Sequence, residues 1–152
     1  MNPALDLELR RDIDVAAEKL WACWTDPALI ERWFCPVPWR ATDVEVDLRP
    51  GGRFNSVIRG PEGEEMPGRG CYLEVVPQRR LVWTDALTEG FRPAASSFMT
   101  GIIAFTPIAG GTHYHALVLH ADAAARERHL AMGFEDGWNA ATDQLVALAR
   151  TL

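Results

Sequence analysis

The sequence predicts an α+β fold in which a curved antiparallel β-sheet wraps around a long C-terminal α-helix. Two observations lead to this prediction. In the middle of the chain, segments with apolar residues at every second position alternate with turns rich in glycine and proline. From about residue 123 onward, the apolar period becomes helical instead. A sheet with one apolar face has to cover that face, and only the last helix is long enough to do so.

The N-terminal part of the chain predicts one strand followed by two short helices. Leucines alternate with polar residues over 5–13, which is typical of a half-buried strand. Asp14 is a suitable N-cap for a helix over 15–24. An aspartate–proline pair then predicts the start of a second short helix over 27–34, because proline is favoured at the first helical position.

Turn signals separate the strands that follow, which indicates a meander of antiparallel strands. The longest irregular segment is the loop over 86–96. After the last strand, Asp122 is placed to cap a helix that runs to about Arg150, or about 28 residues and about 42 Å. The expected strands cover residues 43–48, 53–60, 70–76, 80–85, 97–107 and 112–120.

The expected C-terminal helix contains Gly133 and Gly137, beside the aromatic residues Phe134 and Trp138. A glycine inside a helix costs about 1 kcal/mol relative to alanine, so a pair of them needs a reason. One interpretation is that missing side chains let the helix backbone pack closely on the sheet. The other is that they leave room for a ligand, with the two aromatic side chains as walls.

Composition excludes several classes of function. The chain has 152 residues, which predicts one domain over 1–152, and its net charge of −6 with scattered basic residues argues against nucleic acid or an anionic membrane as partner. The first residues lack the basic-then-apolar pattern of a signal peptide, so we expect a cytoplasmic protein. Three cysteines without metal-ligand spacing predict reduced, mostly buried thiols.

Candidate chemistry is sparse. His113 and His115 share one strand face, as a metal pair would, but no third ligand has an obvious place, so we expect no metal. His120 is the better candidate for a polar group at a cavity mouth, although a structural role is the simpler interpretation. Asp85 follows Trp83 on a strand; inside an apolar cavity it could move a proton, or it could instead cap the loop that follows.

Several motifs together resemble the SRPBCC superfamily, whose fold is shared by START lipid-transfer domains and the major birch-pollen allergen. Within it the chain is similar to the branch named after the activator of the Hsp90 chaperone ATPase. The resemblance implies the fold expected above, with a pocket between sheet and terminal helix, and no cofactor. The matching segments are "LWACWTDPALIERWF" (20–34), "DLRPGGRF" (47–54), "GRGCYLEVVPQRRLVWT" (68–84), "FTPIAGGTHY" (105–114) and "MGFEDGWNAATDQLVAL" (132–148).

Three functions remain open at this point. The first is binding of a small hydrophobic molecule, such as an aromatic or polyketide-like compound, with His120 or Asp85 as polar contacts. The second is an enzyme of the cyclase or dehydratase type using the same cavity and the same two residues as catalytic candidates. The third is a chaperone-associated partner, which the branch name suggests, and a homodimer through exposed aromatic side chains is compatible with each. The expected pocket residues are Phe54, Trp83, Met99, Tyr114, His120, Phe134 and Trp138.

Overall fold

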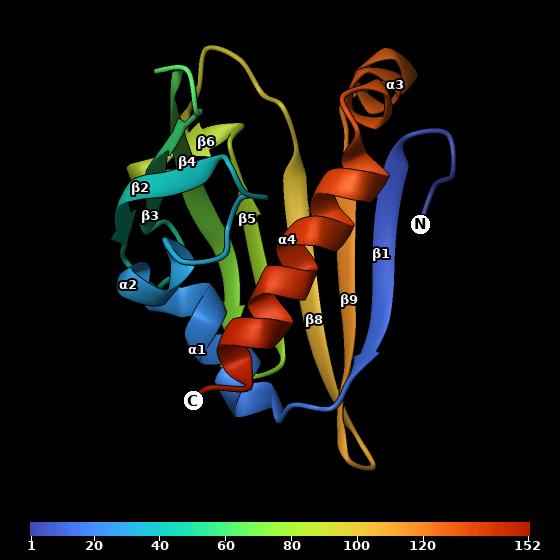
Figure 1. The fold of residues 1–152 in the computed structure, drawn as a ribbon. Helices are drawn as coiled ribbons and strands as arrows, with labels where there is room; N and C mark the ends of the chain where they lie inside the picture. Colours follow the sequence, from blue (N-terminus) through green and yellow to red (C-terminus); the bar gives the residue numbers. More distant parts are fainter.

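The computed structural model describes residues 1–152 and contains a seven-stranded antiparallel sheet in the order β1-β9-β8-β5-β4-β3-β2. This confirms the predicted α+β fold. The sheet is curled, and β2 at one end of it passes in front of β3 in Figure 1. Its strands are β1 (Asp6–Ile13), β2 (Arg40–Val46), β3 (Arg53–Arg59), β4 (Glu65–Val76), β5 (Arg80–Thr84), β8 (Thr100–Ile108) and β9 (Gly111–Leu119).

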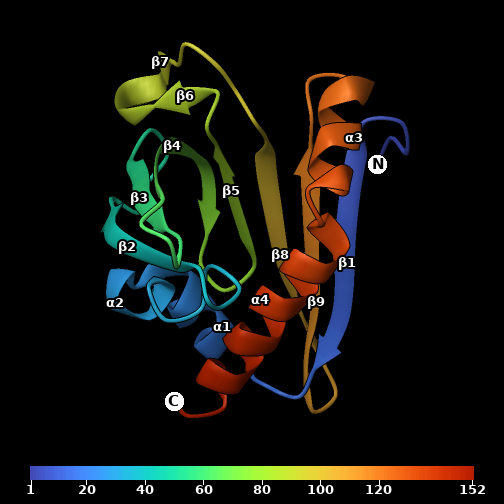
Figure 2. The ribbon, with the colours of Figure 1, turned by 45° about the horizontal axis from the view of Figure 1, so that its top comes forward.

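Four helices accompany the sheet. The last of them, α4, runs diagonally across one face of the sheet, and α1 lies beside its C-terminal end (Figures 1 and 2). Side chains from the sheet, α1 and α4 form the main core, in which Leu20, Trp24 and Leu145 are fully buried. None of these helices is long and apolar enough to cross a membrane. The helices are α1 (Ala17–Thr25), α2 (Pro27–Ile30), α3 (Ala123–Ala131) and α4 (Phe134–Ala149).

The prediction of one continuous C-terminal helix is wrong. The chain forms two helices, and the break falls at Gly133, whose φ of 91° belongs to the left-handed region. Only glycine adopts this conformation without steric cost, so Gly133 ends one helix and allows the next to start in a new direction. Gly137 is different, because it lies within α4 and a Cβ placed there would meet no atom within 4 Å. Close packing on the sheet therefore does not explain Gly137.

Substituting alanine for each of these two glycines should change the free energy of unfolding in opposite directions. Gly137→Ala is expected to raise the free energy of unfolding by about 1 kcal/mol, because alanine favours a helix and the new methyl group meets open space. Gly133→Ala is expected to lower the free energy of unfolding by about 1 kcal/mol, because a positive φ is strained for alanine. Denaturant titration of both variants measures this; a stabilising Gly133→Ala or a destabilising Gly137→Ala contradicts the assignment.

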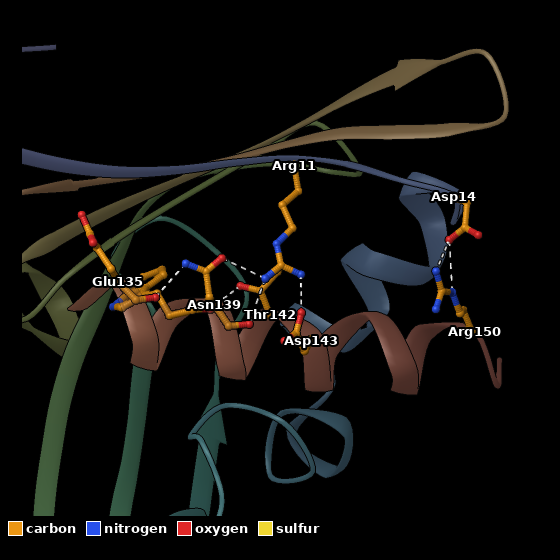
Figure 3. Close-up of polar contacts among 8 residues, drawn as sticks. Arg11, Asp14, Glu135, Asn139, Thr142, Asp143 and Arg150 are labelled. Atoms are coloured by element: carbon orange, nitrogen blue, oxygen red, sulfur yellow. Dashed lines mark hydrogen bonds and ion pairs between the residues drawn. The ribbon is translucent and has the colours of Figure 1, made fainter. Parts of the chain in front are cut away.

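Polar contacts fix α4 against the first strand (Figure 3). The guanidinium of Arg11 on β1 donates to Asp143 Oδ1 at 2.6 Å and to both the backbone and side-chain oxygens of Asn139. Near the end of the helix, Arg150 pairs with Asp14 at 2.7 Å. Asp14 is therefore not the N-cap of α1, as the sequence suggested; Ala16 takes that position without a side-chain hydrogen bond.

Smaller differences from the prediction concern segment lengths. Asp26 does cap α2, accepting a hydrogen bond from Ala28, but this helix ends at Ile30 rather than at residue 34. The long loop after β5 contains two strands of two residues each, β6 (Leu87–Thr88) and β7 (Arg92–Pro93), joined by the short turn η1 (Glu89–Phe91).

Candidate functional site

An apolar cavity of about 140 Å³ lies on the inner face of the curled half of the sheet. Phe54 and Ser56 point into it from β3, since residues two apart share a strand face. Gly70 and Gly68 are their partners on β4, and these glycines leave the space open. Trp83 closes one side from β5. The cavity is lined by Phe34, Phe54, Ser56, Gly68, Arg69, Gly70, Trp83, Thr84, Asp85 and Met99.

Two fully buried polar atoms near this cavity have no hydrogen-bond partner in the protein. They are the indole Nε1 of Trp83, a lining residue, and the hydroxyl of Tyr72, the residue paired with Trp83 on the neighbouring strand β4. Phe54 stacks on Tyr72 at a centroid distance of 5.3 Å and packs against Trp83 at 5.8 Å. Burial raises the pKa of Tyr72, so its phenol stays protonated. Unpaired buried donors cost free energy, so each of these two groups would gain from a hydrogen-bond acceptor.

Phe34 reaches the cavity from the segment between α2 and β2, which α4 holds in place. The amide nitrogen of Gln144 donates to the carbonyl oxygens of Trp33 and Cys35, at 3.0 and 2.7 Å. Its oxygen accepts a hydrogen bond from the backbone of Val37 at 2.9 Å. One side chain of α4 thereby positions the segment that carries Phe34.

Gln144→Ala is expected to lower the free energy of unfolding by about 1–2 kcal/mol, because three hydrogen bonds are lost from a partly buried position. Gln144→Glu is the matched control: it keeps an acceptor for Val37 and loses both donors. Denaturant titration should place Gln144→Glu between wild type and Gln144→Ala. Equal stability of wild type and Gln144→Ala contradicts the assigned role.

A second cavity, of about 190 Å³, lies beside α4. Phe134 and Trp138, whose ring centroids are 5.3 Å apart, form its aromatic part. Gly137 lies between them, so the open space beside this glycine belongs to the cavity. His129 of α3 completes the wall. The lining residues are Pro36, His129, Met132, Gly133, Phe134, Gly137, Trp138 and Ala141.

His129 is part of a buried chain of hydrogen bonds. The Nδ1 atom of His120 lies 2.8 Å from the carbonyl oxygen of Leu5, and its Nε2 atom lies 2.9 Å from Nδ1 of His129. A carbonyl only accepts, so His120 donates through Nδ1 and accepts at Nε2. His129 therefore donates through Nδ1 and is left with a lone pair on Nε2. Burial, together with the neighbouring His120, lowers the pKa of His129 to about 4.

The expected site residues are thus divided among three places. Phe54, Trp83 and Met99 line the first cavity. Phe134 and Trp138 line the second. Tyr114 and His120 line neither, because Tyr114 is buried in the core, where its hydroxyl accepts a hydrogen bond from Trp24, and His120 is held by Leu5 and His129.

Asp85 lies at the rim of the first cavity, but its carboxylate is engaged by the loop that precedes β8. It accepts hydrogen bonds from the backbone of Phe98 and Met99 and from the hydroxyl of Ser97. This is the loop-capping role that the sequence left open. The adjacent hydroxyl of Thr84 bonds to that of Thr100 at 2.8 Å.

His113 and His115 share one face of β9 and are partly exposed. Each binds a separate carboxylate of β1: His113 contacts Asp12 at 2.6 Å and His115 contacts Glu8 at 2.7 Å. No cluster of three metal-ligating side chains occurs in the structure.

Three residues that matter at the cavities were not among the expected site residues. Phe34 was assigned to the end of a helix, and neither Tyr72 nor His129 carried a signal beyond its residue type. The pairing of His129 with His120 joins α3 to the end of β9, nine residues earlier in the chain.

Comparison with known proteins agrees with this fold. The chain matches the family model described as "Activator of Hsp90 ATPase homolog 1-like protein" over residues 14–150. No curated protein matches it. A solved structure from Nitrosomonas europaea is 41% identical, covers 99% of this chain and 97% of that one, and superposes with a TM-score of 0.97.

Two more solved structures are similar. A protein from Rhodobacter sphaeroides is 26% identical over 100% of this chain and 97% of its own, with a TM-score of 0.86. An AHSA1-like protein from Aeromonas hydrophila is 20% identical over 97% of this chain and 93% of its own, with a TM-score of 0.72, and shows the shared fold alone. With the family match extending over nearly the whole sheet and α4, the chain belongs to the Activator of Hsp90 ATPase homolog 1-like family, of the SRPBCC type.

Proposed function

We propose that the protein binds a small apolar molecule, with an aromatic ring and a hydrogen-bond acceptor, in the cavity lined by Phe54, Trp83 and Met99. The observation that carries the proposal is an open apolar cavity with aromatic walls, one of which is formed by Trp83, whose buried indole N–H has no partner in the protein. An apolar pocket with a few well-placed polar groups is the usual form of a small-molecule site. Here a carbonyl or ether oxygen of the ligand is the partner that the indole N–H lacks.

The size of the cavity limits the ligand. At about 140 Å³, it is comparable to a cavity of about 150 Å³ that takes up a molecule of the size of benzene. The cavity is open to the outside, so a longer molecule would extend outward from it. A single ring with a short substituent fits the enclosed part.

Acetophenone and ethylbenzene are a suitable pair of probes, because they share a ring and differ in the carbonyl oxygen. Isothermal titration calorimetry should show that wild-type protein binds acetophenone about tenfold more tightly than ethylbenzene, as one hydrogen bond to a buried donor predicts. Equal affinity for the two, or binding of neither, contradicts the proposal.

Ser56→Leu tests the location. Its larger side chain points into the cavity and should weaken acetophenone binding about tenfold by filling the space. Val57→Leu is the matched control, since it adds bulk to the other face of the same strand and should leave binding unchanged. Acetophenone binding that resists Ser56→Leu places the site elsewhere.

The two enzyme candidates from the sequence gain no support from their surroundings. Asp85 is engaged by three groups of its own loop, and both ring nitrogens of His120 have partners within the protein. A polyketide-sized substrate also needs a larger enclosed volume than the cavity offers. Binding is therefore the function that the geometry supports best.

A further inference from the structure

The cavity beside α4 has a polar group of its own that the proposed function does not use. His129 is only 7% exposed and forms part of the wall, together with Phe134 and Trp138. Its ring packs against Phe134 at a centroid distance of 5.0 Å and against Phe98 at 4.6 Å. The imidazole is therefore fixed in place by aromatic contacts and by its hydrogen bond to His120.

The hydrogen-bond chain determines which atom of His129 is available. The carbonyl oxygen of Leu5 requires a donor, so His120 carries its proton on Nδ1. Nε2 of His120 is then an acceptor, so His129 carries its proton on Nδ1 as well. The remaining Nε2 atom of His129 is an acceptor without a protein partner. Nε2 of His129 is not among the fully buried side-chain atoms without a partner, so it keeps some exposure.

The geometry points to a second ligand site in this cavity, where Nε2 of His129 accepts a hydrogen bond from a small aromatic molecule that carries a hydroxyl group. The flat side of α4 at Gly137 leaves room for a ring beside Trp138. The volume of about 190 Å³ is sufficient for one substituted ring. This site and the proposed site at Trp83 require opposite chemistry, a donor here and an acceptor there.

The charges around the cavity favour a neutral ligand over an anion. The imidazole of His129 is uncharged at neutral pH, because burial and the neighbouring His120 keep its pKa low. Glu135 and Asp136 already occupy the first turn of α4, where they offset the positive end of the helix dipole. A phenol satisfies the acceptor without bringing a negative charge close to these carboxylates.

Phenol and anisole are the probes for this site, since methylation removes the hydroxyl proton and keeps the ring and the oxygen. Wild-type protein should bind phenol about tenfold more tightly than anisole in calorimetric titration. In ¹⁵N spectra of the imidazoles, phenol should shift the Nε2 signal of His129 and anisole should not. Equal affinities, or an unmoved Nε2 signal at saturation, overturn the inference.

Two variants test whether phenol binds in the cavity beside α4. His129→Asn keeps an N–H that can donate to His120 but has no atom in the place of Nε2. The variant should therefore bind phenol and anisole about equally. Gly137→Leu fills the open space without a clash at Cβ and should abolish binding of both probes while α4 stays folded. A phenol preference that survives His129→Asn, or phenol binding that survives Gly137→Leu, contradicts the site.

Ser56→Leu separates this inference from the proposed function. That variant fills the cavity at Trp83 and should leave phenol binding unchanged, because Ser56 does not line the cavity beside α4. If Ser56→Leu removes phenol binding, phenol occupies the first cavity and the second site does not exist. If it removes acetophenone binding alone, the two sites are independent.

Discussion

Replacing Gly101 with alanine is expected to lower the free energy of unfolding by about 3 kcal/mol, through overpacking of the core. A Cβ at this position would clash with Cζ3 and Cη2 of the Trp83 ring. The indole cannot withdraw freely, because Trp24 and Phe54 pack against it at centroid distances of 6.2 and 5.8 Å. The glycine on β8 is therefore what allows Trp83 to lie flat over the sheet and form the cavity wall.

Denaturant titration measures this loss, and calorimetry with acetophenone measures its consequence for the cavity. The displaced ring should also weaken acetophenone binding, because the cavity lies on its free side. Gly137→Ala serves as the control, since it adds the same methyl group where nothing lies within 4 Å. Gly101→Ala with a stability within about 0.5 kcal/mol of wild type contradicts the packing described here.

Mild acid should destabilise the protein by about 2–3 kcal/mol through His129. The pKa of its imidazole is about 4 in the folded protein, below the ordinary value of 6.5 that we take for the unfolded chain. The unfolded state therefore binds a proton more readily between these values. The contribution is fully present above pH 6.5, is lost progressively as the pH falls toward 4, and changes no further below that.

The pH dependence of unfolding in urea tests this prediction, with His129→Asn as the matched variant. Wild type should lose stability between pH 6.5 and 4, and the variant should lose distinctly less over the same range. Parallel curves for the two proteins contradict the assignment of the low pKa to His129.

The sequence predicted the sheet well where apolar residues alternate, as along β1, β8 and β9, because alternation is a local property of each strand. It failed at the last helix because the apolar period of α4 continues the period of α3, so the break at Gly133 leaves no gap in the pattern. A glycine inside a helix and a glycine at a helix end look alike until the backbone dihedral angle is known.

The cavities were predictable only in part. Aromatic residues on inward-facing strand positions, such as Phe54 and Trp83, could be named from their phase alone. Their grouping into two separate cavities depends on distances between elements, which periodicity does not contain. The pairing of His120 with His129 is also of this kind, because it joins the end of a strand to a helix that changes direction afterwards.

The indole N–H signal of Trp83 in a ¹H–¹⁵N spectrum is the most direct measurement of the central claim, that this cavity binds an apolar molecule with an acceptor. The signal is assigned by its loss in Trp83→Phe. Acetophenone at saturation should move it downfield, as a new hydrogen bond does, and ethylbenzene should not. If acetophenone binds and the Trp83 signal stays in place, the unpaired N–H does not recognise the ligand, and the account of this site is wrong.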